Sequence, residues 1–232
     1  MERKRLLTHT LKLQRERGSD RKVARTLGYL SDTNRMMGLH KEGIQQAKEA
    51  LKILEQLGDT ETQAGCLMKL ASLLHSDKQF DAAEEAVTRV IGLVPENRSQ
   101  VYESHRVLGG VYQSKGKTGK AIHHYELALG IASSFNWHDG LSFIHYSLAL
   151  LFLDQGRFDD AHAHIEQTKL HTINNPYYLG RTMELQARIW YKQHRLKEAR
   201  SEALRAVDIF EKLGATKSIE DCRKLLQDIR KK

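Results

Sequence analysis

Histidines are the side chains of this 232-residue sequence best suited to metal chemistry. The sets that lie close together in helical patterns are His123-His124 and His162-x-His164. Residues one or two apart on a helix point in different directions, whereas a metal ion needs ligands that converge at about 2 Å. His105 and His145 hold equivalent positions, about 10 Å apart by the usual spacing of packed helices. The sequence therefore predicts no metal site, and predicts hydrogen bonding in the interior or between units for His105 and His145.

No residue pattern indicates catalysis or a cofactor. Neither GxSxG nor HExxH occurs, and Cys66 and Cys222 lie far apart without a CxxC spacing. Residues 114–119 have the composition of a phosphate-binding loop but not its order, and they suit a turn better. The acidic pair Asp159-Asp160 fits a helix N-terminus, where negative charge is favoured. We therefore expect no enzyme activity and no cofactor, and we expect both cysteines to be small buried residues.

The residues that could bind a partner lie on a helical unit that is clearest in residues 101–133. Leu108, Gly109 and Tyr112 share one face of a first helix, because residues three and four apart are neighbours there. Gly116 ends that helix, and Ala121 and later residues at the same spacing form a second helix that returns against the first. A hairpin of this kind needs neighbouring copies to bury its apolar faces.

The same unit recurs five times in register. The small residues of the first helices are Ser31, Ala71, Gly109, Ala149 and Ala187, at spacings of 40, 38, 40 and 38. Their partners on the second helices, each twelve residues later, are Gly43, Ala83, Ala121, Ala161 and Ala199. This regularity predicts a stacked array of antiparallel helix pairs.

The predicted domain organisation is one array over residues 1–232. Residues 1–18 form the second helix of a truncated repeat, the five repeats are 20–59, 60–98, 99–137, 138–175 and 176–214, and 217–230 form a capping helix. Asn174-Asn175-Pro176 is the plainest break between repeats. We expect the chain to be a fragment of a longer array, with a natural capping helix at residues 1–18 as the alternative.

The recurring pattern has a large residue followed by Gly or Ala and then an aromatic residue on the first helix, and Ala-x-x-x-aromatic-x-x-Ala on the second. The clearest copy consists of Leu108-Gly109, Tyr112, Gly116, Ala121, Tyr125 and Ala128. This pattern resembles the tetratricopeptide repeat. The repeat length of 38–40 residues exceeds the usual 34 and is similar to that of the repeats in kinesin light chains. Second helices that end in Leu-Gly-Asp resemble those in the repeat arrays of fungal nucleotide-binding receptors. The resemblance implies an all-α, right-handed superhelical solenoid that acts as a protein-interaction module.

Composition limits the classes of partner. The chain has 37 Lys and Arg against 29 Asp and Glu, a net charge of +8, but acidic and basic residues are interspersed. The sequence therefore disfavours the continuous basic stripe of a nucleic-acid-binding array. No run approaches the length of about 18 apolar residues that a membrane span needs, and there is no signal-peptide pattern. We expect a cytoplasmic protein.

The exposed positions of the first helices predict a concave groove that binds a peptide or a partner helix. The groove residues assigned to peptide binding are Arg106, Phe143, Tyr146, Leu150, Leu153, Arg188, Tyr191 and Lys192. Apolar groups with a basic rim suit a ligand with apolar and acidic residues. The alternative is that the apolar groups pack internally between repeats, and the sequence does not separate the two.

A second hypothesis is a self-associating spacer. The N-terminal helix carries Leu6, Leu7, Leu11 and Leu13, and these would pair with a second copy if the helix lacks its usual partner.

Overall fold

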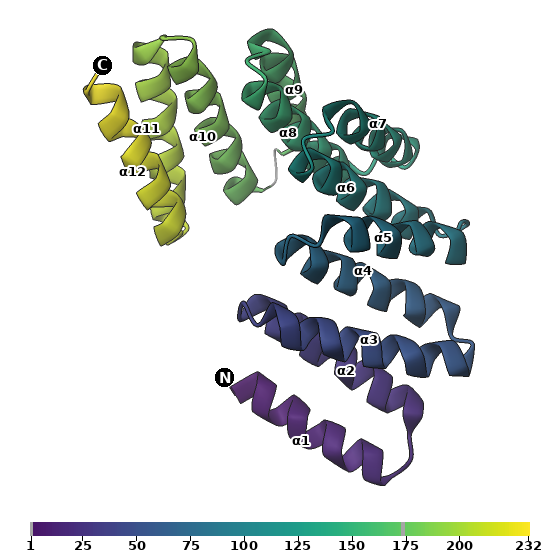
Figure 1. Ribbon diagram of the computed structural model, residues 1–232. Coiled ribbons are helices and arrows are strands. Elements are labelled where there is room, and N and C mark those ends of the chain that lie inside the picture. Colours follow the sequence, from purple (N-terminus) through teal and green to yellow (C-terminus); the bar gives the residue numbers. More distant parts are fainter. Residues whose placement is uncertain (1, 173–174) are drawn as a thin grey trace. The chain divides into compact units, whose positions relative to one another are not determined.

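The computed structural model describes residues 2–172 and 175–232 of the protein (Figure 1). All regular structure in these residues is α-helical, and the all-α fold expected from the sequence is confirmed. The chain divides into two compact units, Met1–Ala128 and Leu129–Lys232, and the division falls within one helix. The predicted single array therefore stays a prediction, and each unit is described by itself.

The first unit contains α1 (Glu2–Glu16), α2 (Asp20–Met36), α3 (His40–Leu57), α4 (Thr60–Ser76), α5 (Phe80–Leu93), α6 (Arg98–Ser114) and the larger part of α7 (Thr118–Ser134). The second unit contains the rest of α7, α8 (His138–Asp154), α9 (Phe158–His171), α10 (Pro176–Lys192), α11 (Leu196–Lys212) and α12 (Thr216–Arg230). Asn174, part of the predicted break, lies outside the described residues. Asn175 caps α10, because its Oδ1 accepts a hydrogen bond from the Tyr178 amide at 3.3 Å.

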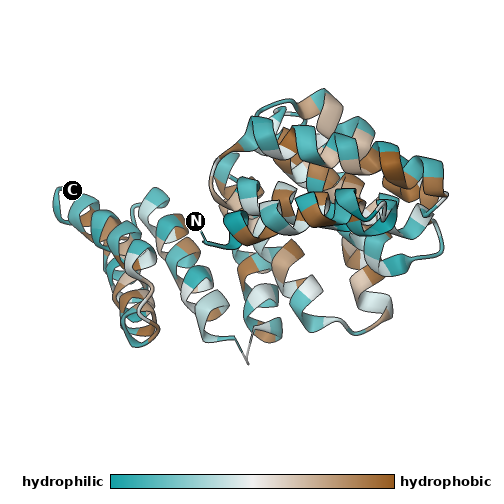
Figure 2. Ribbon diagram, turned by 90° about the horizontal axis from the view of Figure 1, so that it is seen from below, coloured by the Kyte–Doolittle hydropathy of each residue, from teal (hydrophilic) through white to brown (hydrophobic). Residues whose placement is uncertain are grey.

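The small residues that define the repeat lie where the two helices of a pair meet. Ala71 and Ala83, on α4 and α5, are both completely buried, and so are Ala149 and Ala161 on α8 and α9. In each unit the first helix of a repeat also touches the first helix of the next, α2 with α4 and α8 with α10. Hydrophilic and hydrophobic residues alternate along the ribbons (Figure 2), as expected for helices with one face buried. No helix within residues 2–172 and 175–232 is long and apolar enough to cross a membrane.

The turn inside each hairpin holds one residue with left-handed backbone geometry. Glycine occupies it in three repeats, as Gly38, Gly116 and Gly156. Lys78 (φ 61°) and His194 (φ 60°) occupy it in the second and fifth repeats. A side chain with a Cβ costs roughly 1–2 kcal/mol in that conformation, and glycine does not.

Replacing Lys78 or His194 with glycine is therefore expected to raise the free energy of unfolding by about 0.5–1 kcal/mol each, since part of the relieved strain is offset by the freer unfolded chain. Urea denaturation followed by circular dichroism measures the change. Gln155→Gly is the matched control, because Gln155 is exposed, lies directly before the left-handed position of such a turn and has φ −89°. If Lys78→Gly lowers stability as much as Gln155→Gly does, the strain argument is wrong.

Candidate functional site

Three predicted groove residues form a partly exposed apolar stripe along α8. Phe143, Tyr146 and Leu150 are each half-buried, and they follow one another at i, i+3 and i+7, which places them on one face of the helix. The first helix of the next repeat, α10, contacts α8. We call these three residues the anchor stripe. They leave apolar surface available on α8 in the second unit.

Leu153 does not belong to this surface. The sequence register placed it in the groove, but its side chain is only 6% exposed. Three residues beyond Leu150, it lies in the last turn of α8, where the neighbouring buried residues Leu151 and Phe152 also face the packed interior. The structure corrects the expectation of an exposed groove position, and Leu153 is a packing residue.

Tyr146 is tied to α10 by a hydrogen-bonded network that sequence reasoning did not assign to the site. Arg181 donates from Nη2 to the Tyr146 hydroxyl at 3.1 Å and from Nη1 to Glu184 Oε2 at 2.7 Å. Glu184 is only 6% exposed, and its burial raises the pKa of the carboxyl although Arg181 and Arg188 oppose that rise. Burial also raises the pKa of Tyr146. The network fixes the orientation of the tyrosine ring against α10.

The sequence signal for this network is the spacing of opposite charges. Arg181 and Glu184 stand three residues apart, the separation at which an arginine and a carboxylate meet on one helix face. The repeat register alone does not show that Glu184 is buried, because its burial depends on how α10 packs against α8 and α12.

Of the two basic residues predicted for α10, Arg188 lies beside this network. Arg188 is half-buried and acts electrostatically on both Tyr146 and Glu184, and no carboxylate in the described part of the chain forms an ion pair with it. Lys192 is exposed. Tyr191 is half-buried, and the Lys232 Nζ lies 4.5 Å from the centre of its ring. The second unit thus brings apolar and basic groups onto the adjacent helices α8 and α10.

Arg106, the remaining predicted site residue, belongs to the first unit. It lies on α6 and forms a bidentate ion pair with Glu103, one turn earlier on the same helix, with Nε at 2.7 Å from Oε2. Its charge is therefore already matched within α6. The structure gives no reason to join Arg106 to the residues of the second unit.

The acidic pair at the start of α9 and the two cysteines have structural surroundings rather than those of a reactive site. Asp160 receives a hydrogen bond from Arg157 Nε at 2.7 Å in the first turn of α9. Cys66 and Cys222 are free and buried, and burial raises their thiol pKa values to about 11 and about 12, far from those of a reactive cysteine. In the described ranges no three His, Cys, Asp or Glu residues are placed to hold a metal ion.

His105 and His145 hydrogen-bond as expected, but to partners that the sequence did not suggest. The Nδ1 of His105 lies 3.1 Å from that of His124, and the Nδ1 of His145 lies 2.9 Å from that of His164. Each pair joins the first and second helices of one repeat. Both pairs have the same separation of 19 residues, which is the signal that could have revealed them.

Comparison with known proteins gives the family context. Residues 100–168 match the tetratricopeptide repeat family. "Protein KINESIN LIGHT CHAIN-RELATED 3" of Arabidopsis thaliana is 25% identical over 227 residues, which cover 92% of this chain. The matched region is 35% of that relative's length, so the chain spans about a third of the curated protein that it resembles.

Solved structures share the fold. BtubC (BKLC) from P. vanneervenii superposes with a TM-score of 0.78 at 16% identity, covering 91% of both chains. A Rap protein complexed with competence and sporulation factor superposes with a TM-score of 0.67 at 14% identity, covering 92% of this chain and 65% of that one. These comparisons support the predicted repeats and the similarity to kinesin light chains, and they do not show the predicted link to fungal nucleotide-binding receptors.

Proposed function

From its tetratricopeptide repeats and its similarity to kinesin light chains, we propose that this chain is a non-enzymatic interaction scaffold that holds a peptide or a partner helix on the first helices of its second unit. The observation that carries the proposal is the anchor stripe on α8, whose apolar side chains remain partly exposed beside the basic residues of α10. Partly exposed apolar groups next to charges are typical of binding surfaces.

The chemistry of the surface defines the ligand. Leu150 and Phe143 offer apolar contact, Tyr146 offers a ring held in place by Arg181, and Arg188 offers a cation without an ion-pair partner in the described residues. A peptide with one bulky apolar residue and acidic neighbours satisfies all of these groups. The same fold in a Rap protein is complexed with competence and sporulation factor, which supports a ligand-binding role for such arrays.

The test measures binding of fluorescently labelled peptides by polarisation. The probe carries a leucine or tryptophan flanked by glutamates, and its comparison peptide carries lysines in place of the glutamates. We expect the acidic probe to bind more tightly. Arg188→Gln should weaken binding of this probe about tenfold, equivalent to about 1.4 kcal/mol, because it removes the attraction to the acidic residues without placing a second carboxylate beside Glu184. Leu150→Ala should weaken it as well, because it removes an apolar contact.

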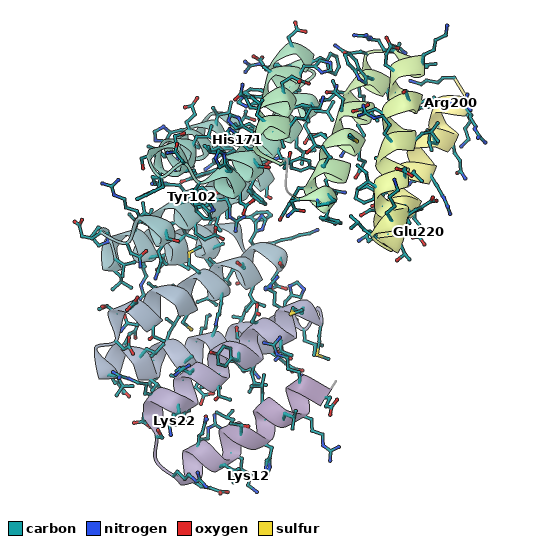
Figure 3. All side chains as sticks on the ribbon, turned by 180° about the vertical axis from the view of Figure 1, so that it is seen from behind. Lys12, Lys22, Tyr102, His171, Arg200 and Glu220 are labelled. Carbon is teal, nitrogen blue, oxygen red and sulfur yellow. The ribbon has the colours of Figure 1, made fainter. Side chains whose placement is uncertain are left out.

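Arg200→Gln is the matched control. Arg200 is an exposed arginine on α11, the second helix of the same repeat (Figure 3). The same loss of charge there should leave affinity within about twofold, because an exposed charge away from the contact contributes little. Equal loss in Arg188→Gln and Arg200→Gln, or no preference for the acidic probe, would contradict the proposed surface. Arg106 is left out of this test, because it belongs to the first unit and is paired with Glu103.

Other outcomes would point to the alternative functions. Leu6 is 61% exposed and Leu13 is 39% exposed on α1, whereas Leu11 is buried, so self-association through α1 would show as a mass that rises with concentration in sedimentation. A nucleic-acid-binding array would instead bind labelled oligonucleotides with an affinity that falls steeply as salt is raised.

A further inference from the structure

Four histidines of the fourth repeat form a connected row between α8 and α9. His145 and His164 are 2.9 Å apart between their Nδ1 atoms, and His138 and His171 are 3.0 Å apart in the same way. The rings of His145 and His171 stack with 6.2 Å between their centres, which links the two pairs. We call these four residues the histidine row. Two of them come from α8 and two from α9, so the row joins the two helices of the hairpin.

The geometry of each pair depends on how many protons it holds. Two Nδ1 atoms at about 3 Å form a hydrogen bond only when one carries a hydrogen and the other offers a lone pair. A neutral pair meets this condition with one ring in each tautomer. When both rings are protonated, two N–H groups point at each other and two positive charges lie about 3 Å apart. The second proton therefore replaces an attraction with a repulsion.

We propose that the histidine row is an acid-sensitive lock, which holds α8 against α9 at neutral pH and releases the two helices when the paired rings are protonated. This property is independent of what the groove binds. The same arrangement occurs in the third repeat, where His105 and His124 are paired at 3.1 Å and the Tyr112 ring stacks on His124. In the fourth repeat Phe152 stacks on His164 in the equivalent way. Two repeats thus place a histidine pair under an aromatic ring at the same register.

The charged and titratable groups around the histidine row determine how strongly pH affects it. The charges that act on His145 come from His164 and His171, and the charge that acts on His171 comes from His138. Asp139 lies on α8 in the hollow that His138 and His171 also line. On α9, His162 bonds to Gln186 of α10 and to Gln193, the residue directly after α10. The charged groups of α10 that act on α8 are Arg181, Glu184 and Arg188, and they act on Tyr146.

The third repeat differs in its surroundings. Glu84 of α5 accepts a hydrogen bond from the Tyr112 hydroxyl at 2.6 Å and favours protonation of His124. Lys120 and His123 on α7 oppose it. Among the residues that the structure describes, the charges that act on His145 include no carboxylate, which makes the fourth repeat the clearer case.

The direction of the pH effect follows from the burial of these rings. Burial, and then the neighbouring histidines, lower the pKa of His145 from 6.5 to about 4. Below about pH 6.5 His145 binds a proton in the unfolded chain, whereas in the folded chain it binds one only as the pH approaches about 4. The folded state therefore loses stability as the pH falls from about 6.5 towards 4, and this histidine contributes no such loss above that range. Burial lowers the pKa of His171 as well, with the same sign.

The test compares thermal unfolding at neutral and mildly acidic pH in the wild type and in His145→Leu/His164→Ala. This double variant has the residues of the second repeat, where Leu67 and Ala86 are buried at the same register without a histidine pair. We expect acidification to about pH 5 to lower the unfolding midpoint of the wild type by about 2–4 °C more than that of the variant. His9→Gln, which removes an exposed histidine of α1, should keep the full wild-type response.

Two further measurements keep the proposal testable if the double variant folds poorly. Hydrogen exchange at acidic pH, corrected for the intrinsic rate, should increase more in α8 and α9 than in α11. Histidine titration by nuclear magnetic resonance should give a lower pKa for His145 in the folded protein than in the urea-unfolded chain. An acid response that is identical in the wild type and the double variant, or a His145 pKa that is the same in the folded and unfolded chain, would overturn the proposal.

Discussion

Replacing Phe210 with alanine is expected to lower the free energy of unfolding of the second unit by about 3–5 kcal/mol. The Phe210 ring is completely buried in a cluster with Met183, Ala206 and Cys222, which come from α10, α11 and α12. It also lies so close to Gly180 that a Cβ at that position would approach Phe210 Cε1 to 2.8 Å. Removing the ring would leave a cavity where three helices meet, and helices held by their other contacts cannot close it fully.

Urea denaturation followed by tryptophan fluorescence measures this effect, because Trp137 and Trp190 both lie in the second unit. Leu204→Ala is the control on the same helix, since Leu204 is 49% exposed and its loss should cost about 0.5 kcal/mol or less. If Phe210→Ala were no more destabilising than Leu204→Ala, the cluster around Phe210 would not be the core that the structure indicates.

The helical pattern could be predicted because it depends on contacts that are local in sequence. Ala149 and Ala161 are twelve residues apart, and their small size sets where α8 and α9 meet. Such pairs recur at the same spacing in every repeat, so a repeat with an atypical residue can still be assigned from the positions of the others. The same reasoning locates the ends of helices, as at Gly116, which lies just beyond α6 with φ 68°.

The site was harder to predict because exposure depends on contacts between repeats. Leu150 and Leu153 are both apolar positions of α8, yet only Leu150 remains partly exposed in the packed unit. Glu184 looks like a surface residue in the sequence, but the packing of α10 against its neighbouring helices buries it, and Arg181 balances its charge. Such outcomes are decided by the rotation of one helix against the next, which a repeat register does not specify.

The histidine pairs show a third kind of limit. The sequence relates His164 to His162 on the same helix and His145 to His105 in the adjacent repeat. The actual partner, His164, lies across the hairpin: His145 stands four residues before Ala149, and His164 stands three residues after Ala161. The repeat register contains this relation, because the two small residues mark the crossing point of the helices.

Replacing Gly109 with alanine is expected to destabilise the first unit by about 1–2 kcal/mol. A Cβ at this position would lie 2.4 Å from Tyr125 Cε1 and 2.5 Å from Cδ1, closer than atoms pack. Tyr125 is only 3% exposed and its hydroxyl bonds to Gln113 at 3.1 Å, so the ring has little room to move. Overpacking costs about 1–3 kcal/mol, of which the better helix propensity of alanine offsets up to about 1 kcal/mol.

The other repeats supply a compensating change for this variant. Where the small residue is alanine, the residue at the register of Tyr125 is smaller than tyrosine: Val87 in the repeat of Ala71 and Ile165 in the repeat of Ala149, and all four are buried. Gly109→Ala/Tyr125→Ile should therefore recover most of the stability that Gly109→Ala loses, in denaturation followed by circular dichroism and in hydrogen exchange of α6. If the double variant instead lost as much stability as Gly109→Ala and Tyr125→Ile lose together, the close approach of the Tyr125 ring would not be what requires glycine at position 109. Recovery would show that glycine and tyrosine in the third repeat are one packing solution, and alanine with a branched aliphatic residue another, for the same crossing of two helices.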